Sequence, residues 1–212
     1  MAERDELIVA HGGYRKLKSF QIAQLIYDVT VRFCDRYVER RSRTRDQMVQ
    51  AARSGVQNIA EGSQASGTSK KTELRLTNVA RASLEELRLD YEDYLRQRQL
   101  KAWVPHHPAL LRFKAKRCAT LEQVRAWVQE ERGRTQTHTA EHGRSVMVRA
   151  GPCPSLPSAQ LVANAALSLL NLACYLLDRQ LQVQAATFEC EGGFTERLYR
   201  VRSHNRLRDP RR

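Results

Sequence analysis

Apolar residues recur at every third or fourth position along four long segments of this chain. This spacing gathers them on one face of an α-helix, whereas alternation at every second position would indicate a β-strand. No segment shows a strand pattern. The pattern therefore predicts an all-α protein, with long helices over about residues 17–39, 46–61, 69–99 and 158–187.

The links between the first three predicted helices are short, which forces consecutive helices to lie antiparallel. The fourth helix would then fill the remaining groove, so we expect an antiparallel up-down four-helix bundle with a long insert before the fourth helix. The inner face of the second helix is made of small residues, among them Ala52 and Gly55, so that a neighbouring backbone can approach closely. Gly62 is predicted to end this helix, because glycine adopts the left-handed conformation without steric cost, and 63–68 is predicted to form a tight polar loop.

The helical pattern weakens over residues 101–157. Only a short helix from about Leu121 to Glu131 is indicated, residues 133–143 are almost free of apolar side chains, and three prolines exclude regular structure from 151–157. The expected divisions are an N-terminal extension (1–13), helices one to three (14–100), an insert or connector (101–157), the fourth bundle helix (158–190), and a short closing helix with a solvated basic tail (191–212).

The fourth predicted helix is apolar on almost all sides from Leu161 to Leu181, apart from a narrow stripe at Asn164, Asn171 and Asp178. Such a helix must be covered on several sides or lie in a membrane. The apolar run to Leu177 falls short of the roughly 20 residues that a bilayer requires, and it contains two asparagines and a serine. We therefore expect a buried bundle helix and no membrane association.

The chain carries a formal net charge of +13, with 29 arginines and 7 lysines. A large positive surplus attracts polyanions, and the guanidinium group forms bidentate contacts with phosphate. Nucleic acid, with RNA favoured, is the expected partner; the alternative is that the charge serves only solubility. Three basic clusters are the candidate phosphate-binding elements: Arg40, Arg41, Arg43 and Arg45 in the first link, Arg112, Lys114, Lys116 and Arg117 in the insert, and Arg197, Arg200, Arg202, Arg206 and Arg208 near the C-terminus.

No catalytic constellation is recognisable, and we expect neither a cofactor nor a small-molecule substrate. The five cysteines are widely spaced without a C-x-x-C unit, and His106, His107 and Cys118 are interpreted as loop and core residues rather than metal ligands. Residues 1–9 contain no apolar stretch of the kind found in secretory signals. The cysteines are therefore expected to be reduced, and the protein cytoplasmic.

Asn58 and Glu61 lie near the predicted end of the second helix. A carboxylate is disfavoured at a helix C-terminus, so Glu61 should have a compensating partner. The preferred interpretation is a buried hydrogen-bond anchor between helices; the other is an active-site acid or ligand. Asn58, Glu61 and Gly62 are therefore treated as a structural motif.

Several segments resemble the S23, or 23S rRNA-intervening-sequence, family of bacterial four-helix bundle proteins. The resemblance covers roughly 14–100 and depends on Tyr14–Phe20, Gln47–Ser54, Gln57–Gly62 and Ala80–Leu87. The stretch from Ala163 to Glu196, with its Gly192-Gly193-Phe194 element, looks like the "suffix" version of that family.

The resemblance implies a bacterial origin and a small, basic, non-enzymatic bundle. Some relatives form pentameric barrels that bind nucleic acid and a reverse transcriptase. The resemblance therefore implies a homo-oligomer, such as a pentamer. In this chain an insert of over fifty residues separates the third and fourth helices.

Three functional hypotheses remain. The favoured one is a non-enzymatic bundle that binds RNA or DNA through arginine-rich surfaces, as a ring-shaped homo-oligomer. The alternative is a protein–protein interaction scaffold in which the apolar fourth helix completes an oligomer interface. An enzyme with an unfamiliar site would require a deep polar pocket around Glu61.

Overall fold

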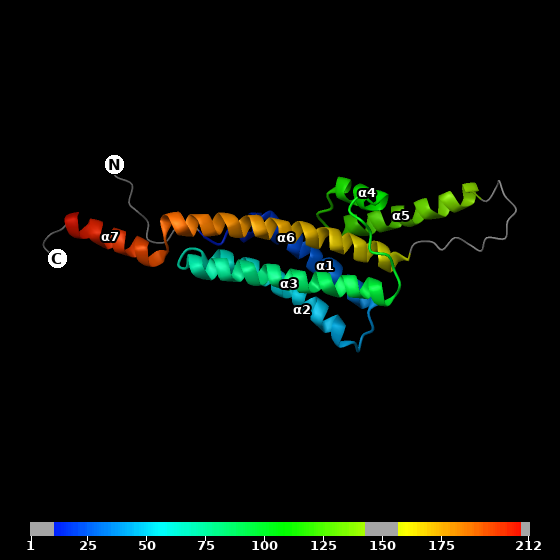
Figure 1. Cartoon of the computed structure of the whole chain (residues 1–212), viewed down its shortest axis with the longest axis horizontal. Helices are drawn as coiled ribbons and strands as arrows, with labels where there is room; N and C mark the ends of the chain where they lie inside the picture. The colour runs from blue at the N-terminus through cyan, green and yellow to red at the C-terminus, as the bar shows by residue number, and fades with distance from the viewer. Residues whose placement is uncertain (1–10, 143–156, 209–212) are drawn as a thin grey trace.

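The structure is a computed structural model that describes residues 11–142 and 157–208. All regular secondary structure in these two ranges is helical, which confirms the all-α prediction (Figure 1). The elements are a 3₁₀ turn at Tyr14–Lys16 and the helices α1 (Lys18–Tyr37), α2 (Arg43–Ala65), α3 (Lys70–Gln97), α4 (Pro108–Lys116), α5 (Leu121–His142), α6 (Ser158–Glu191) and α7 (Phe194–Arg208).

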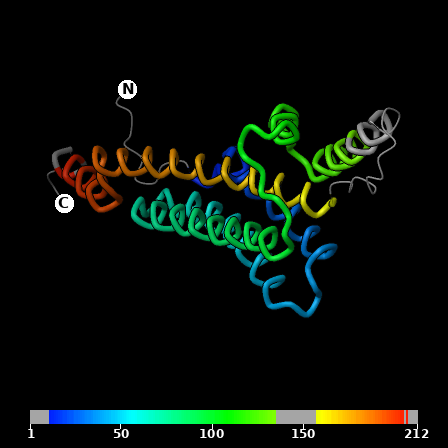
Figure 2. Tube along the Cα trace, turned by 45° about the vertical axis from the view of Figure 1, so that its right-hand side comes forward, coloured from blue at the N-terminus to red at the C-terminus, as the bar shows by residue number. Residues whose placement is uncertain are grey.

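Helices α1, α2, α3 and α6 enclose the main core, with α2 packed on α1 and α3, and α6 packed on the same two helices. α3 and α6 lie side by side and run in opposite directions (Figures 1 and 2). Phe33 of α1 is almost fully buried and contacts the rings of Tyr91 and Tyr94 of α3, at centroid distances of 4.9 and 4.7 Å. The Tyr91 hydroxyl donates to Thr30 at 3.1 Å, so this buried polar group is satisfied.

The expected end of the second helix is wrong. α2 continues through Gly62 to Ala65, and Gly62 is buried against α3. A Cβ atom at this position would lie 3.3 Å from the Leu76 Cβ and 3.4 Å from the Glu73 carbonyl oxygen. Gly62 is therefore explained by the close approach of two helices rather than by a left-handed cap.

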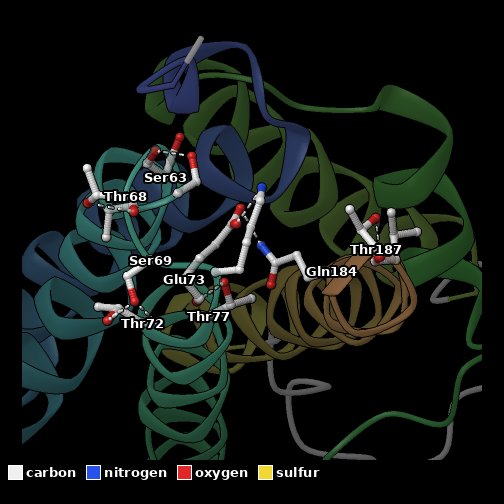
Figure 3. A network of polar contacts seen from close by, with 12 residues as sticks. Ser63, Thr68, Ser69, Thr72, Glu73, Thr77, Gln184 and Thr187 are labelled. Atoms are coloured by element: carbon white, nitrogen blue, oxygen red, sulfur yellow. Dashed lines mark hydrogen bonds and ion pairs between the residues drawn. The ribbon is translucent and has the colours of Figure 1, made fainter. Parts of the chain in front are cut away.

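The corner between α2 and α3 is shorter than expected and is closed by side-chain hydrogen bonds (Figure 3). Ser69 caps α3 by accepting a hydrogen bond from the Thr72 N–H at 3.2 Å, in agreement with the predicted start of this helix. One turn later, Glu73 accepts hydrogen bonds from Lys70 at 3.2 Å and from Gln184 of α6 at 3.1 Å. The corner is thereby linked to the C-terminal half of α6.

The insert is not a loose connector. It contains α4, which the sequence pattern did not predict, and α5 continues through the polar stretch after residue 132 as far as His142. Phe113 and Trp127 pack at a centroid distance of 4.8 Å, and both belong to the same apolar cluster as α1 and α6. The expected simple four-helix arrangement is therefore incomplete, because α4 and α5 add a second layer over α6 (Figure 1).

The link between α3 and α4 is fastened by a buried asparagine of α6. Asn164 is 1% exposed; its Oδ1 accepts from the Trp103 N–H at 2.7 Å and its Nδ2 donates to the Lys101 carbonyl at 3.0 Å. Gln160, one turn earlier, donates to the same carbonyl at 3.0 Å. Part of the polar stripe on the fourth helix thus provides hydrogen-bond partners for backbone groups of the insert.

α6 is long and apolar enough to cross a membrane by length and composition, but 61% of its most apolar window is buried inside the structure. That burial, against α1, α3, α4 and α5, is typical of a core helix. The predicted short closing helix is present as α7, which extends over residues 194–208 and so includes most of the stretch expected to be a basic tail. The irregular structure predicted for 151–157 falls mainly outside the described residues, as do the extension 1–10 and the end of the tail, 209–212.

Candidate nucleic-acid interface

The first basic cluster occupies the corner between α1 and α2. Arg40, Arg41 and Arg43 are exposed there. Arg45 differs, because its guanidinium contacts the Asp35 carboxylate at 2.6 Å, and this hydrogen bond is the main reason why the pKa of Arg45 is raised. Three arginines of the predicted cluster therefore face solvent, while Arg45 joins the two helices.

The second cluster is largely occupied by contacts within the insert. Arg112 holds Glu131 with two hydrogen bonds of 2.7 and 2.6 Å, which raises the pKa of Arg112. Lys116 pairs with Glu130 at 2.7 Å, and Lys114 donates to a backbone carbonyl at 3.0 Å. The Arg112 and Lys116 bonds join α4 to α5, whereas the Lys114 bond joins α4 to the link before it. Arg117, which ends α4 in the left-handed conformation, is exposed.

The third cluster lies on α7, beyond the end of the bundle that is opposite to the α1–α2 corner (Figure 1). Arg200 donates to the Glu191 carbonyl at 2.9 Å, and Arg202 and Arg206 are exposed. Arg197 is half-buried, and Arg208 is the last residue of the helix. The three predicted clusters are therefore not brought together into one surface.

The structure assembles a fourth basic site that sequence reasoning missed. A groove of about 370 Å³ lies between α1, α5 and the start of α6. Its lining includes Arg32 and Arg36 of α1 and Arg125 and Arg132 of α5, all four of them exposed. We call this site the arginine groove. Its two arginine pairs are about ninety residues apart in the chain, so no local motif could indicate it.

All charged side chains that line the arginine groove are positive. No carboxylate lines it, and none of its four arginines forms an ion pair with another described residue. By contrast, other described arginines are paired, including Arg81 with Asp178 at 3.1 Å and Arg88 with Glu85 at 2.7 Å. The first turn of α6 contains no acidic residue and contributes the positive end of its helix dipole at Ser158.

A second groove, of about 480 Å³, lies between α2 and α3. It contains Arg43 but also Asp46 and Glu86, so its charges are mixed. Glu61 lines neither groove. The arginine groove is therefore the better candidate for an anion.

The predicted structural motif of Asn58, Glu61 and Gly62 is only partly as expected. Asn58 donates to the carbonyl and the hydroxyl of Ser54 at 2.9 and 3.0 Å, and Ser54 contacts the Ser83 hydroxyl at 2.9 Å, which links α2 to α3. Glu61 is exposed instead of buried, so its predicted role as an inter-helix anchor is wrong. α2 continues to Ala65, so Glu61 does not stand at the helix C-terminus, where a compensating partner was expected.

Cys34, Cys118, Cys174 and His107 take structural positions, whereas Cys190 and His106 are exposed. Cys34 and Cys174 are buried, and burial raises the pKa of each thiol to about 12, so both stay protonated near neutral pH. His107 stacks on Trp103 at 4.2 Å and accepts from the Ala109 N–H at 3.3 Å, which caps α4. Cys118 is a core residue, and Cys153 lies outside the described residues.

Comparison with known proteins finds a family model that matches the first three helices. The family model of the 23S rRNA-intervening sequence proteins matches residues 16–101, fewer than half of the 212 residues. Over this segment the chain is similar to the 23S rRNA-intervening sequence proteins. No curated protein matches the chain, and no solved structure does.

The family segment supplies only part of the arginine groove. Arg32 and Arg36 lie within the 23S rRNA-intervening sequence match, whereas Arg125 and Arg132 come from the insert. The exposed corner arginines lie within the match as well. The groove therefore combines the family helices with a region that the family model does not cover.

Proposed function

We propose that this chain is a non-enzymatic, cytoplasmic protein that binds nucleic acid, with RNA favoured, through arginine-rich surfaces. In this proposal α1, α2, α3 and α6 act as the up-and-down four-helix bundle of the family, with α6 as the "suffix" helix. The observation that carries the proposal is the set of exposed arginines, at the α1–α2 corner and in the arginine groove, that have no carboxylate partner within residues 11–142 and 157–208. The family name, which refers to ribosomal RNA, favours RNA over DNA.

Binding of a labelled RNA should weaken steeply with salt. Each arginine–phosphate contact contributes about 0.7–0.9 to the slope of log affinity against log salt, because it releases a condensed counterion. The triple variant Arg40→Gln/Arg41→Gln/Arg43→Gln should lower this slope by about 2–3 if all three contact phosphates. Fluorescence anisotropy between 50 and 200 mM salt measures both quantities.

A matched control removes three arginines that are already paired within the chain. Arg81, Arg88 and Arg96 form ion pairs with Asp178, Glu85 and Asp93, so their replacement by glutamine should change the slope much less. Absence of RNA binding by the wild-type protein at 50 mM salt would refute the proposed function.

An oligomeric scaffold is the second candidate, and it is favoured by one face of α6. Leu172, Tyr175 and Val183 are 42%, 61% and 63% exposed, and their spacing places them on the same side of the helix. An exposed apolar stripe of this kind marks an interaction surface. It is the surface through which copies of the chain would form a ring, such as a pentamer, or bind another protein.

Multi-angle light scattering tests this candidate. The wild-type protein should have a mass that is a multiple of 24.4 kDa, and Tyr175→Glu/Val183→Glu should return it to a monomer. The control variant Leu111→Glu/Tyr199→Glu changes two exposed apolar residues on other helices (51% and 74% exposed), and it should keep the oligomer. A wild-type monomer at all concentrations tested would rule out the homo-oligomer.

A further inference from the structure

We infer that the arginine groove binds a single-stranded segment of nucleic acid, with phosphates on its arginines and an unpaired base on its apolar floor. The inference deepens the proposed function and depends on it. It assigns a specific site and strand type to a chain whose basic charge alone indicates only a polyanion.

The arginines form two rows along the edges of the groove. Arg32 and Arg36 are one helical turn apart on α1, and Arg125 and Arg132 are two turns apart on α5. At a rise of 1.5 Å per residue, the arginines of each row are separated by about 6 and about 10.5 Å along their helix axes. Two such rows can contact consecutive phosphates of a strand that follows the groove.

The floor between the rows is apolar. It is formed by Val29 and Phe33 of α1, Val124 and Val128 of α5, and Val162 of α6. The half-buried ring of Tyr37 closes one side, with the Arg36 guanidinium 5.8 Å from its centroid. An apolar floor beside cationic edges provides for the two parts of a nucleotide, the phosphate and the flat face of the base.

The strand type follows from access to this floor. In a duplex the base faces are stacked inside the helix, so a duplex could contact the arginine edges but could not place a base in the groove. A volume of about 370 Å³ lies at the lower end of the range for small-molecule pockets, which suits a single nucleotide rather than a larger group. An acidic peptide would satisfy the arginines but would leave the floor without a planar group.

The test uses the full-length protein and three fluorescein-labelled ligands in anisotropy titrations at 0.1 M salt. The ligands are a single-stranded RNA of mixed sequence, the same RNA annealed to its complement, and an abasic oligonucleotide of equal length that keeps its phosphates. The groove variant is Arg32→Gln/Arg125→Gln. The control variant is Arg53→Gln/Arg75→Gln, which removes the same charge from exposed positions of α2 and α3.

The wild-type protein should bind the single strand more tightly than the duplex, and loss of the bases should weaken binding by about fivefold or more per base seated in the groove. Two lost phosphate contacts lower the salt slope by about 1.4, which corresponds to about 25-fold weaker binding of the single strand at 0.1 M salt. The control variant should lose much less affinity. Circular dichroism of both variants should match that of the wild type, because all four substituted arginines are exposed.

The outcomes separate this inference from the proposed function. RNA binding that is equally affected by the groove and control variants, or that does not distinguish the single strand from the duplex or from the abasic oligonucleotide, would overturn the inference and leave the proposed function intact. Competition by polyglutamate as effective as by the single-stranded RNA would also overturn it. Absence of binding to every ligand would refute both.

Discussion

Replacing Trp127 with alanine should lower the free energy of unfolding by about 3–5 kcal/mol, the cost of removing a large aromatic side chain from a packed core. Trp127 is 0% exposed and contacts Phe113, which belongs to α4. It lies on the short helix that the sequence pattern predicts within the insert. A loss of this size, measured by urea denaturation, would show that α4 and α5 unfold together with the bundle.

The control is Leu111→Ala. Leu111 lies on α4 and is 51% exposed, so its truncation should change the unfolding free energy by no more than about 0.5 kcal/mol. If Trp127→Ala gave two separate transitions, with the main one at the wild-type midpoint, α4 and α5 would form an independent unit. That result would contradict the shared core described above.

Replacing Asn164 with alanine should destabilise the protein by about 2–3 kcal/mol, because the Trp103 N–H loses its acceptor in a place with little access to water. The lost donor to the Lys101 carbonyl matters less, since Gln160 also donates to that oxygen. The effect should appear in the unfolding free energy, and hydrogen exchange should become faster at the Trp103 amide.

Asn171→Ala is the matched control for Asn164→Ala. Asn171 lies on the same helix two turns later but is exposed, and alanine has the higher helix propensity, so no loss is expected. Equal effects of the two substitutions would mean that the hydrogen bonds of Asn164 contribute little to the attachment of the insert.

The helical faces of α1, α3 and α6 could be predicted from sequence because their periodic apolar residues are those that the core buries. Ile26, Leu87 and Leu170 are examples; all three are fully buried. The predicted start of the third helix near residue 69 was also correct, since a capping hydroxyl and the helix start it controls are only a few residues apart. These features are local, so a local pattern is sufficient to find them.

Gly62 and Glu61 show where local reasoning fails. A glycine after a helical stretch is equally compatible with a cap and with a tight crossing, and only the position of α3 distinguishes the two. The same holds for Asn164, whose partners are about sixty residues away along the chain. A polar residue on an apolar helix indicates an exposed stripe until the segment that covers it is known.

For the basic surfaces, too, some features follow from the sequence alone and others depend on tertiary structure. Composition alone established the large positive charge, because net charge does not depend on the fold. The expectation of a polyanionic partner follows from that charge. Which arginines remain available was decided by tertiary structure, since ion pairs with Asp35 and Glu131 engage Arg45 and Arg112. The amino-acid order determined the helices and their buried faces through short-range spacing. The attachment of the insert and the arginine groove arise only when α1, α5 and α6 meet, because contacts between distant segments leave no periodic trace in the chain.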